Sequence, residues 1–119
     1  MADIEALRKQ IMDQLFDYSY DIICGTKTVI GELRNGRESD TEELFNLVIQ
    51  GINWEIEIFN SCENIINRDE ERVNKVQMAA AVSRLGKILP EKDDVKLAAC
   101  LEVDFLPFLR NMKDAAEAY

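Results

Sequence analysis

The side chain with the most unusual setting in this chain is the carboxyl group of Glu55. When residues 41–67 are wound as an α-helix, Glu55 falls in the middle of the apolar face, between Ile52 and Phe59. A buried carboxylate is costly unless it is protonated or paired. One hypothesis is a tuned acid or a ligand-binding carboxylate. The favoured hypothesis is an internal hydrogen bond or ion pair, or a groove that admits water, because perturbed carboxyls also occur in structural networks.

An antiparallel arrangement of helices would bring three polar side chains within reach of Glu55. If the segments on either side of residues 35–40 pair, Glu55 lies level with Asp21, on a turn shared with Tyr18 and Ile22, and the hydroxyl of Tyr18 or Ser19 could reach it. A third helix that returns alongside would place Arg84 one turn away. We expect Glu55 to be mostly buried and bonded to Tyr18, Ser19 or Arg84.

Trp54, the only tryptophan, lies at the edge of the same apolar face. Partly exposed tryptophans are frequent anchors of protein–protein contacts. The sequence therefore predicts a candidate site, either for a partner or as a buried polar cluster, from Trp54, Glu55 and Arg84. The aromatic side chains at helical spacing could line a pocket, but core positions are the favoured interpretation; they are Tyr18, Tyr20, Trp54, Phe105 and Phe108.

Residues for the commonest catalytic chemistries are missing. The chain contains no histidine, which removes the usual general base and the commonest transition-metal ligand. Cys24, Cys62 and Cys100 are widely spaced and are interpreted as small apolar packing residues. The segment Cys-Gly-Thr-Lys-Thr at 24–28 resembles a phosphate loop only faintly, because it lies inside a helical stripe. No cofactor and no catalytic residue are predicted.

Carboxylates at metal-binding spacing are also sparse. All-helical nucleotide pyrophosphohydrolases hold magnesium with carboxylates three residues apart on facing helices. Here that spacing occurs as Asp40 with Glu43, at a helix start, and as Asp114 with Glu117, near the last residues. We predict no metal site, and an enzyme or small-ligand binder that uses carboxylates in a bundle groove is kept as the alternative function.

Composition indicates one globular domain over residues 1–119. Apolar residues make up 47% of the chain, which is enough for a core, and the two prolines and five glycines suit long helices. No run of residues is apolar enough to span a bilayer, and the first residues lack the features of a signal peptide. The expected location is therefore the cytoplasm.

The net charge of −9 is concentrated in one segment. Residues 38–67 carry seven acidic side chains and no basic ones, whereas residues 1–37 and 68–119 are nearly balanced. Such a surface repels nucleic acids and anionic membranes. Two interpretations follow: a solvated face that aids solubility, which is favoured, and a docking face for a basic protein partner.

Apolar residues at steps of three and four predict an all-α fold, an antiparallel up-and-down four-helix bundle. The expected helices lie near 3–35, 41–67, 69–89 and 93–118. Gly36 ends the first helix, and Asn67 or Asp69 caps the third. Pro107 interrupts an apolar pattern that continues in phase, so we expect the last helix to kink there rather than end. A single helix over 41–89 is rejected because it would be about 74 Å long and would extend beyond the ends of the neighbouring helices.

A recognisable segment lies at residues 92–109, Lys-Asp-Asp-Val-Lys-Leu-Ala-Ala-Cys-Leu-Glu-Val-Asp-Phe-Leu-Pro-Phe-Leu. Together with Gly-Ile-Asn-Trp at 51–54, it resembles a family of small helical-bundle proteins of Gram-positive bacteria. The pattern of that family has a Lys-Asp start, a Leu-Ala-Asp-Leu-Leu-Glu middle and an acidic-Leu-Leu-Pro end. The chain departs from it at Ala99-Cys100, where an acid is expected. The family is functionally uncharacterised, so the resemblance implies the fold and the compartment and no activity or site.

The leading functional hypothesis is a cytoplasmic protein-interaction module, either an adaptor or a small acidic chaperone-like binder. It rests on the small size, the acidic segment and the missing catalytic motifs. A protein partner of basic character is expected, and nucleic acids and membranes are not. A self-assembling structural bundle, which would be a homo-oligomer, is a further alternative.

Overall fold

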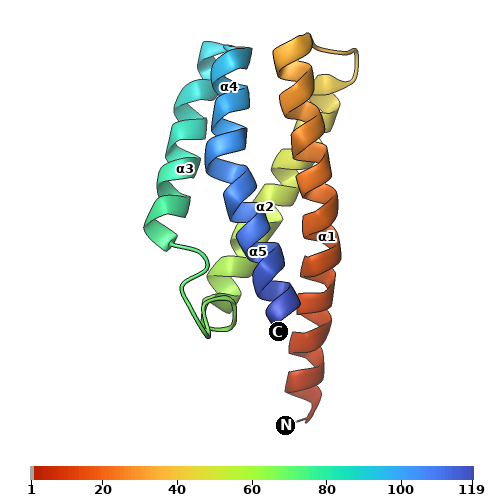
Figure 1. Cartoon of the computed structure of the whole chain (residues 1–119), viewed down its shortest axis with the longest axis vertical. Coiled ribbons are helices and arrows are strands. Elements are labelled where there is room, and N and C mark those ends of the chain that lie inside the picture. The colour runs from red at the N-terminus through yellow and green to blue at the C-terminus, as the bar shows by residue number, and fades with distance from the viewer. Residues whose placement is uncertain (1) are drawn as a thin grey trace.

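The computed structural model describes residues 2–119, which form helices joined by short loops, with no strand among them (Figure 1). The elements are α1 (Ala2–Asn35), α2 (Thr41–Ile66), α3 (Lys75–Ile88), the 3-10 helix η1 (Leu89–Glu91), α4 (Asp94–Cys100), the π-helical η2 (Leu101–Phe105) and α5 (Leu106–Ala118). α4, η2 and α5 follow one another without a break and form one long fourth helix. The predicted four-helix bundle is confirmed. Within the described residues, no helix is long and apolar enough to cross a membrane.

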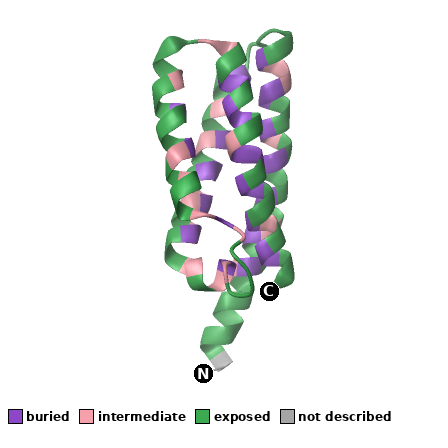
Figure 2. Cartoon of the chain, turned by 60° about the vertical axis from the view of Figure 1, so that its left-hand side comes forward, coloured by how far each residue is buried: buried purple, intermediate pink, exposed green. Residues whose placement is uncertain are grey.

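α1 is the longest element and forms the spine of the bundle. It packs against α2, α4 and α5, whereas α3 packs mainly against α4, η1 and η2. Figure 1 shows α3 at one edge of the bundle, beside α4, with α1 at the opposite edge and α2 crossing behind α5. The apolar stripes face inward, so buried and exposed positions alternate along each helix (Figure 2). The largest fully buried apolar side chains are those of Met12, Leu15, Ile52, Phe59, Ile66, Leu101, Phe105, Leu109 and Met112.

The turn between α1 and α2 is held by Thr41. Gly36, with a φ of 118°, takes the left-handed conformation directly after α1, which confirms the predicted end of the first helix. The buried Thr41 hydroxyl accepts a hydrogen bond from the Glu38 N–H at 2.8 Å and donates one to the carboxylate of Glu32. This short, fixed loop keeps α1 and α2 as antiparallel neighbours.

The third helix starts later than the sequence predicts. Asn67 or Asp69 is the expected cap, but α3 begins at Lys75 and the intervening residues form a loop. The Asn67 side chain accepts a hydrogen bond from the N–H of Val73 and donates one to the Val73 carbonyl. These local bonds take the place of helical backbone bonds, and they accompany the burial of Val73. Asn74 then caps α3 with its side chain.

The last helix continues through Pro107, as the apolar pattern predicts. Proline has no N–H to donate to the carbonyl four residues earlier, and its ring crowds that turn. The backbone widens into η2 directly before the proline, and the α-helix resumes at Leu106. The expected kink therefore takes the form of a π-helical segment. A second irregularity, at Cys62 of α2 (φ −125°, ψ 25°), is not predicted by the sequence.

Candidate functional site

A glycine lets α1 and α2 approach closely at the candidate site. A Cβ atom on Gly51 would lie 2.7 Å from side-chain atoms of Ile22 and 3.4 Å from the ring of Tyr18. A larger side chain at Gly51 would therefore have to displace the Ile22 side chain or widen the spacing between the two helices. The close contact also fixes the neighbouring turns, which carry Tyr18 on α1 and Trp54 on α2.

Tyr18 and Trp54 form an aromatic pair at this contact. Their ring centroids lie 4.9 Å apart, with an angle of 60° between the ring planes. Tyr18 is 44% exposed and Trp54 is half-buried, so the interpretation of Tyr18 as a core residue is wrong. The pair borders a cleft of about 580 Å³ between the two helices. The other residues that line the cleft are Gln14, Asp17, Asp21 and Gln50.

One residue further along each helix lies a buried polar pair, Ser19 and Glu55. Neither residue has exposed surface, and the Ser19 hydroxyl donates a hydrogen bond to Oε1 of Glu55 at 3.0 Å. Oε2 of Glu55 has no hydrogen-bond partner within residues 2–119. Burial raises the pKa of Glu55 to about 8, and the Ser19 hydrogen bond opposes this rise. The carboxyl group is therefore mostly protonated at neutral pH. The prediction that Glu55 is buried and hydrogen-bonded is confirmed, with Ser19 as the partner.

Arg84, the third predicted site residue, lies elsewhere. Its guanidinium donates two hydrogen bonds of 2.8 Å to the carboxylate of Asp104 on η2. Hydrogen bonding to Arg84 lowers the pKa of Asp104. The structure thus brings Trp54 and Glu55 together and separates Arg84 from them, because α3 packs mainly on the side of α4 and η2.

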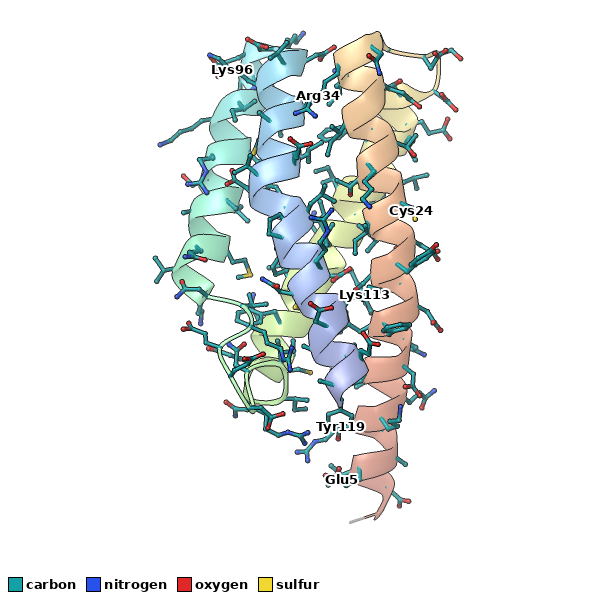
Figure 3. All side chains as sticks on the ribbon, in the orientation of Figure 1. Glu5, Cys24, Arg34, Lys96, Lys113 and Tyr119 are labelled. Carbon is teal, nitrogen blue, oxygen red and sulfur yellow. The ribbon has the colours of Figure 1, made fainter. Side chains whose placement is uncertain are left out.

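Two further arginines form bidentate ion pairs that the sequence does not predict. Arg34 of α1 donates two hydrogen bonds of 3.0 Å to Glu102 of η2, and Arg37 donates bonds of 2.9 and 2.8 Å to Asp94 of α4. In Figure 3, Arg34 lies between α1 and the neighbouring fourth helix. These residues are far apart in the chain, so no local spacing signals the pairs. They orient the fourth helix against α1, and their exposure to solvent keeps their contribution to stability small.

The three cysteines are free thiols in different settings. Cys100 is buried, and its thiol donates a hydrogen bond to the Asp104 carboxylate at 3.5 Å. Burial, followed by this hydrogen bond, raises the pKa of Cys100 to about 11. Cys62 is partly buried, whereas Cys24 is exposed on the outer side of α1 (Figure 3), so the interpretation as a packing residue is wrong for Cys24. No group of three or more metal-ligating side chains occurs within the described residues.

Comparison with known proteins gives the chain a family. A family model described as a domain of unknown function, DUF8042, matches residues 10–115. The chain belongs to this family. No curated protein and no solved structure matches the chain.

The DUF8042 domain contains the whole candidate site. All four residues of the aromatic pair and the buried polar pair fall within the matched residues 10–115. The hydrogen bond from the Tyr119 hydroxyl to the Glu5 carboxylate, 3.1 Å long, joins residues outside that range (Figure 3). The cleft and the buried carboxyl group therefore lie within the part of this chain that the family model matches, and the expected membership of an uncharacterised family is confirmed.

Proposed function

We propose that this DUF8042 chain is a protein-interaction module that binds a basic segment of a partner protein. The observation that carries the proposal is the Tyr18–Trp54 pair beside a cleft that also holds carboxylates. Aromatic rings of this kind attract arginine and lysine by cation–π interaction, and they are common anchors of protein interfaces. The proposed docking surface is the α1–α2 face, which consists of the aromatic pair and the other residues lining the cleft.

The charge of the α1–α2 face favours a basic partner. Asp17 and Asp21 line the cleft, and neither forms an ion pair within residues 2–119. Residues 38–67, which include the whole of α2, carry seven acids and no bases. Such a field steers cationic segments towards the face and disfavours nucleic acids and anionic membranes. The proposed partner is therefore a protein.

The same proposal covers the cellular compartment of the protein and the choice between an adaptor and a chaperone-like binder. The three free thiols support a reducing compartment, the cytoplasm. A small cleft with a single aromatic pair suits an adaptor that holds one short segment better than a chaperone-like binder, which needs a broad apolar surface. The resemblance to bundle proteins of Gram-positive bacteria is consistent with this compartment and carries no information on the role. Self-assembly into a homo-oligomer is the competing proposal, and sedimentation at several concentrations tests it.

Fluorescence anisotropy of a labelled peptide tests the main proposal. The probe is a capped peptide of four arginines carrying fluorescein, titrated with the wild-type chain and with Trp54→Ala at low and physiological ionic strength. We expect saturable binding that Trp54→Ala weakens about tenfold or more, as for an aromatic anchor. Leu47→Ala is the matched control, because Leu47 is an apolar side chain of the same helix that is 56% exposed. This control should bind as the wild type does.

Two results would contradict the proposal. One is equal binding of the arginine peptide by the wild type and by Trp54→Ala. The other is equal binding of a control peptide of four glutamates. A thermal-shift screen with nucleotides and divalent metals covers the alternative, because reproducible stabilisation by one of these ligands would favour an enzyme or small-ligand binder instead.

A further inference from the structure

The buried carboxyl group of Glu55 lies between α1 and α2, four residues along α2 from the close contact of Gly51 with Ile22. Its Oε1 accepts the hydrogen bond from Ser19, while its Oε2 has no partner among the described residues. The side chains next to this pair in sequence, Tyr18 and Trp54, form the outer wall of the contact. The carboxyl group of Glu55 therefore lies on the inner side of the proposed docking surface. It has no cationic side chain as a partner, and one of its two oxygen atoms makes no hydrogen bond within the described residues.

No charged group compensates an ionised Glu55. Only its burial and the Ser19 hydrogen bond act on its pKa. On α1, Asp17, Tyr18 and Asp21 lie on the turns next to Ser19, and Glu57 lies two residues from Glu55 on α2. The charged side chains of α5, which packs against both helices, are Arg110, Lys113, Asp114 and Glu117. Lys113, on the helix that packs against both α1 and α2, lies 4.9 Å from the ring centroid of Phe16 (Figure 3). The Ser19 hydrogen bond alone does not offset the cost of burying a negative charge on Glu55, so the ionised carboxylate needs water as a further partner.

Water can reach Glu55 only if the two helices separate locally. The side chain of Ile22 already lies within 2.7 Å of the position that a Cβ atom on Gly51 would occupy, so the contact has no spare room. We propose that loss of the Glu55 proton to solvent loosens α1 from α2 beneath the Tyr18–Trp54 pair, and that a cationic group bound in the cleft promotes this loss. The second half of the proposal rests on the proposed function, whereas the first half does not.

Thermodynamic linkage fixes the direction of the effect. A bound cation stabilises the ionised form of a nearby carboxyl group, so ionisation must strengthen the binding of that cation by the same factor. Arginine is the suitable probe because its guanidinium stays charged throughout the pH range concerned. The affinity of the α1–α2 face for an arginine peptide should therefore rise with pH, and binding should release a proton.

Acrylamide quenching of Trp54 tests the first half without a ligand. Trp54 is the only tryptophan, so its emission reports on this contact alone. Between about pH 6 and pH 9, the quenching constant of the wild type should rise with a midpoint near 8, the value to which burial raises the pKa of Glu55. Glu55→Gln should show no such rise. Glu57→Gln, which removes an exposed carboxylate from the same helix, should follow the wild type. Ser19→Ala should move the midpoint to higher pH, because the Ser19 hydrogen bond lowers the pKa of Glu55.

A flat wild-type profile would overturn the proposal, and so would a transition that persists in Glu55→Gln. Ser19→Ala gives an independent check, since a midpoint that stays in place or falls would show that another group causes the transition. Glu55→Gln keeps a side chain of the same shape that accepts the same hydrogen bond, so it reports on the charge rather than on a cavity.

Peptide binding at two pH values tests the second half. The wild type should bind the arginine peptide about fivefold or more tightly at about pH 9 than at about pH 6.5, a coupling of ordinary size. Glu55→Gln should bind with the same affinity at both. If the wild type binds the peptide with an affinity that does not change with pH, only the proposed coupling between Glu55 and the bound cation is overturned. A wild type that binds at neither pH would overturn the proposed function, while the quenching result still decides whether ionisation loosens the contact.

Discussion

Replacing Glu55 with Gln should remove a steep pH dependence from the stability of the fold. The pKa of Glu55 is about 8 in the folded chain, above its usual 4.5. Between these two values the folded chain keeps a proton that the unfolded chain has lost. The free energy of unfolding must therefore fall as the pH rises from about 4.5 to about 8 and level off above that, where both states are ionised.

The size of the effect follows from the same two values. Each pH unit in the interval removes about 1.4 kcal/mol. The whole interval removes on the order of 5 kcal/mol, of which about 3 kcal/mol are already lost at pH 7. Glu55 has no exposed surface, so solvent screening reduces this little. Gln can accept the Ser19 hydrogen bond but does not titrate, so the difference in stability between the variant and the wild type should grow by this amount.

Urea denaturation followed by helical circular dichroism measures the effect. The experiment is run on wild type and Glu55→Gln at several values between about pH 5 and pH 9, and the difference between the two proteins cancels the titration of every other group. Glu57→Gln, on the exposed face of α2, is the control and should run parallel to the wild type. Parallel curves for wild type and Glu55→Gln would refute the reasoning, because they would mean that folding leaves the Glu55 carboxyl in water.

Gly51→Ala should lower the free energy of unfolding by about 1–3 kcal/mol in urea denaturation, because the new methyl group collides with α1. Gly31→Ala, which has open space around it, should instead raise it by up to about 1 kcal/mol, and the same sign for both would contradict the reasoning. Asn67→Ala should cost about 1–3 kcal/mol by the same measurement, since it removes the side-chain hydrogen bonds that hold the loop before α3; a change near zero would count against that role. Iodoacetamide labelling read by mass spectrometry should modify Cys24 in the native chain and Cys100 only after unfolding, because burial covers the Cys100 thiol and raises its pKa; equal labelling rates would oppose this.

Apolar periodicity explains why most of the fold can be predicted from the sequence. Stripes at steps of three and four give the number of helices, and the short loop at 35–40 makes the first two antiparallel neighbours. Winding α2 at the helical period is enough to place Glu55 inside. Counting back through the short loop places Glu55 level with Asp21, within about one turn of its actual partner, and leaves Tyr18, Ser19 and Arg84 as candidates from which only the packing selects Ser19.

Features that depend on distant contacts escape the same reasoning. Arg84 meets Asp104 rather than Glu55 because the side of the bundle on which α3 packs is decided by several helices at once. The late start of α3 depends on hydrogen bonds from Asn67 to a loop whose path no propensity predicts. Tyr18 lies on an apolar stripe, yet close contact at Gly51 leaves its ring outside, against tryptophan.

α3 adds only Ala81 and Leu85 to the buried residues, and its contacts are mainly with α4, η1 and η2. Detaching it would uncover little apolar surface, while α1, α2 and α5 would keep their contacts with one another. Segments of this kind open in separate steps with a lower free energy than global unfolding. The amide hydrogens of α3 should therefore exchange sooner than those in the middle of α1, and the domain unfolds as a cooperative core of three helices from which the outer helix has already come away.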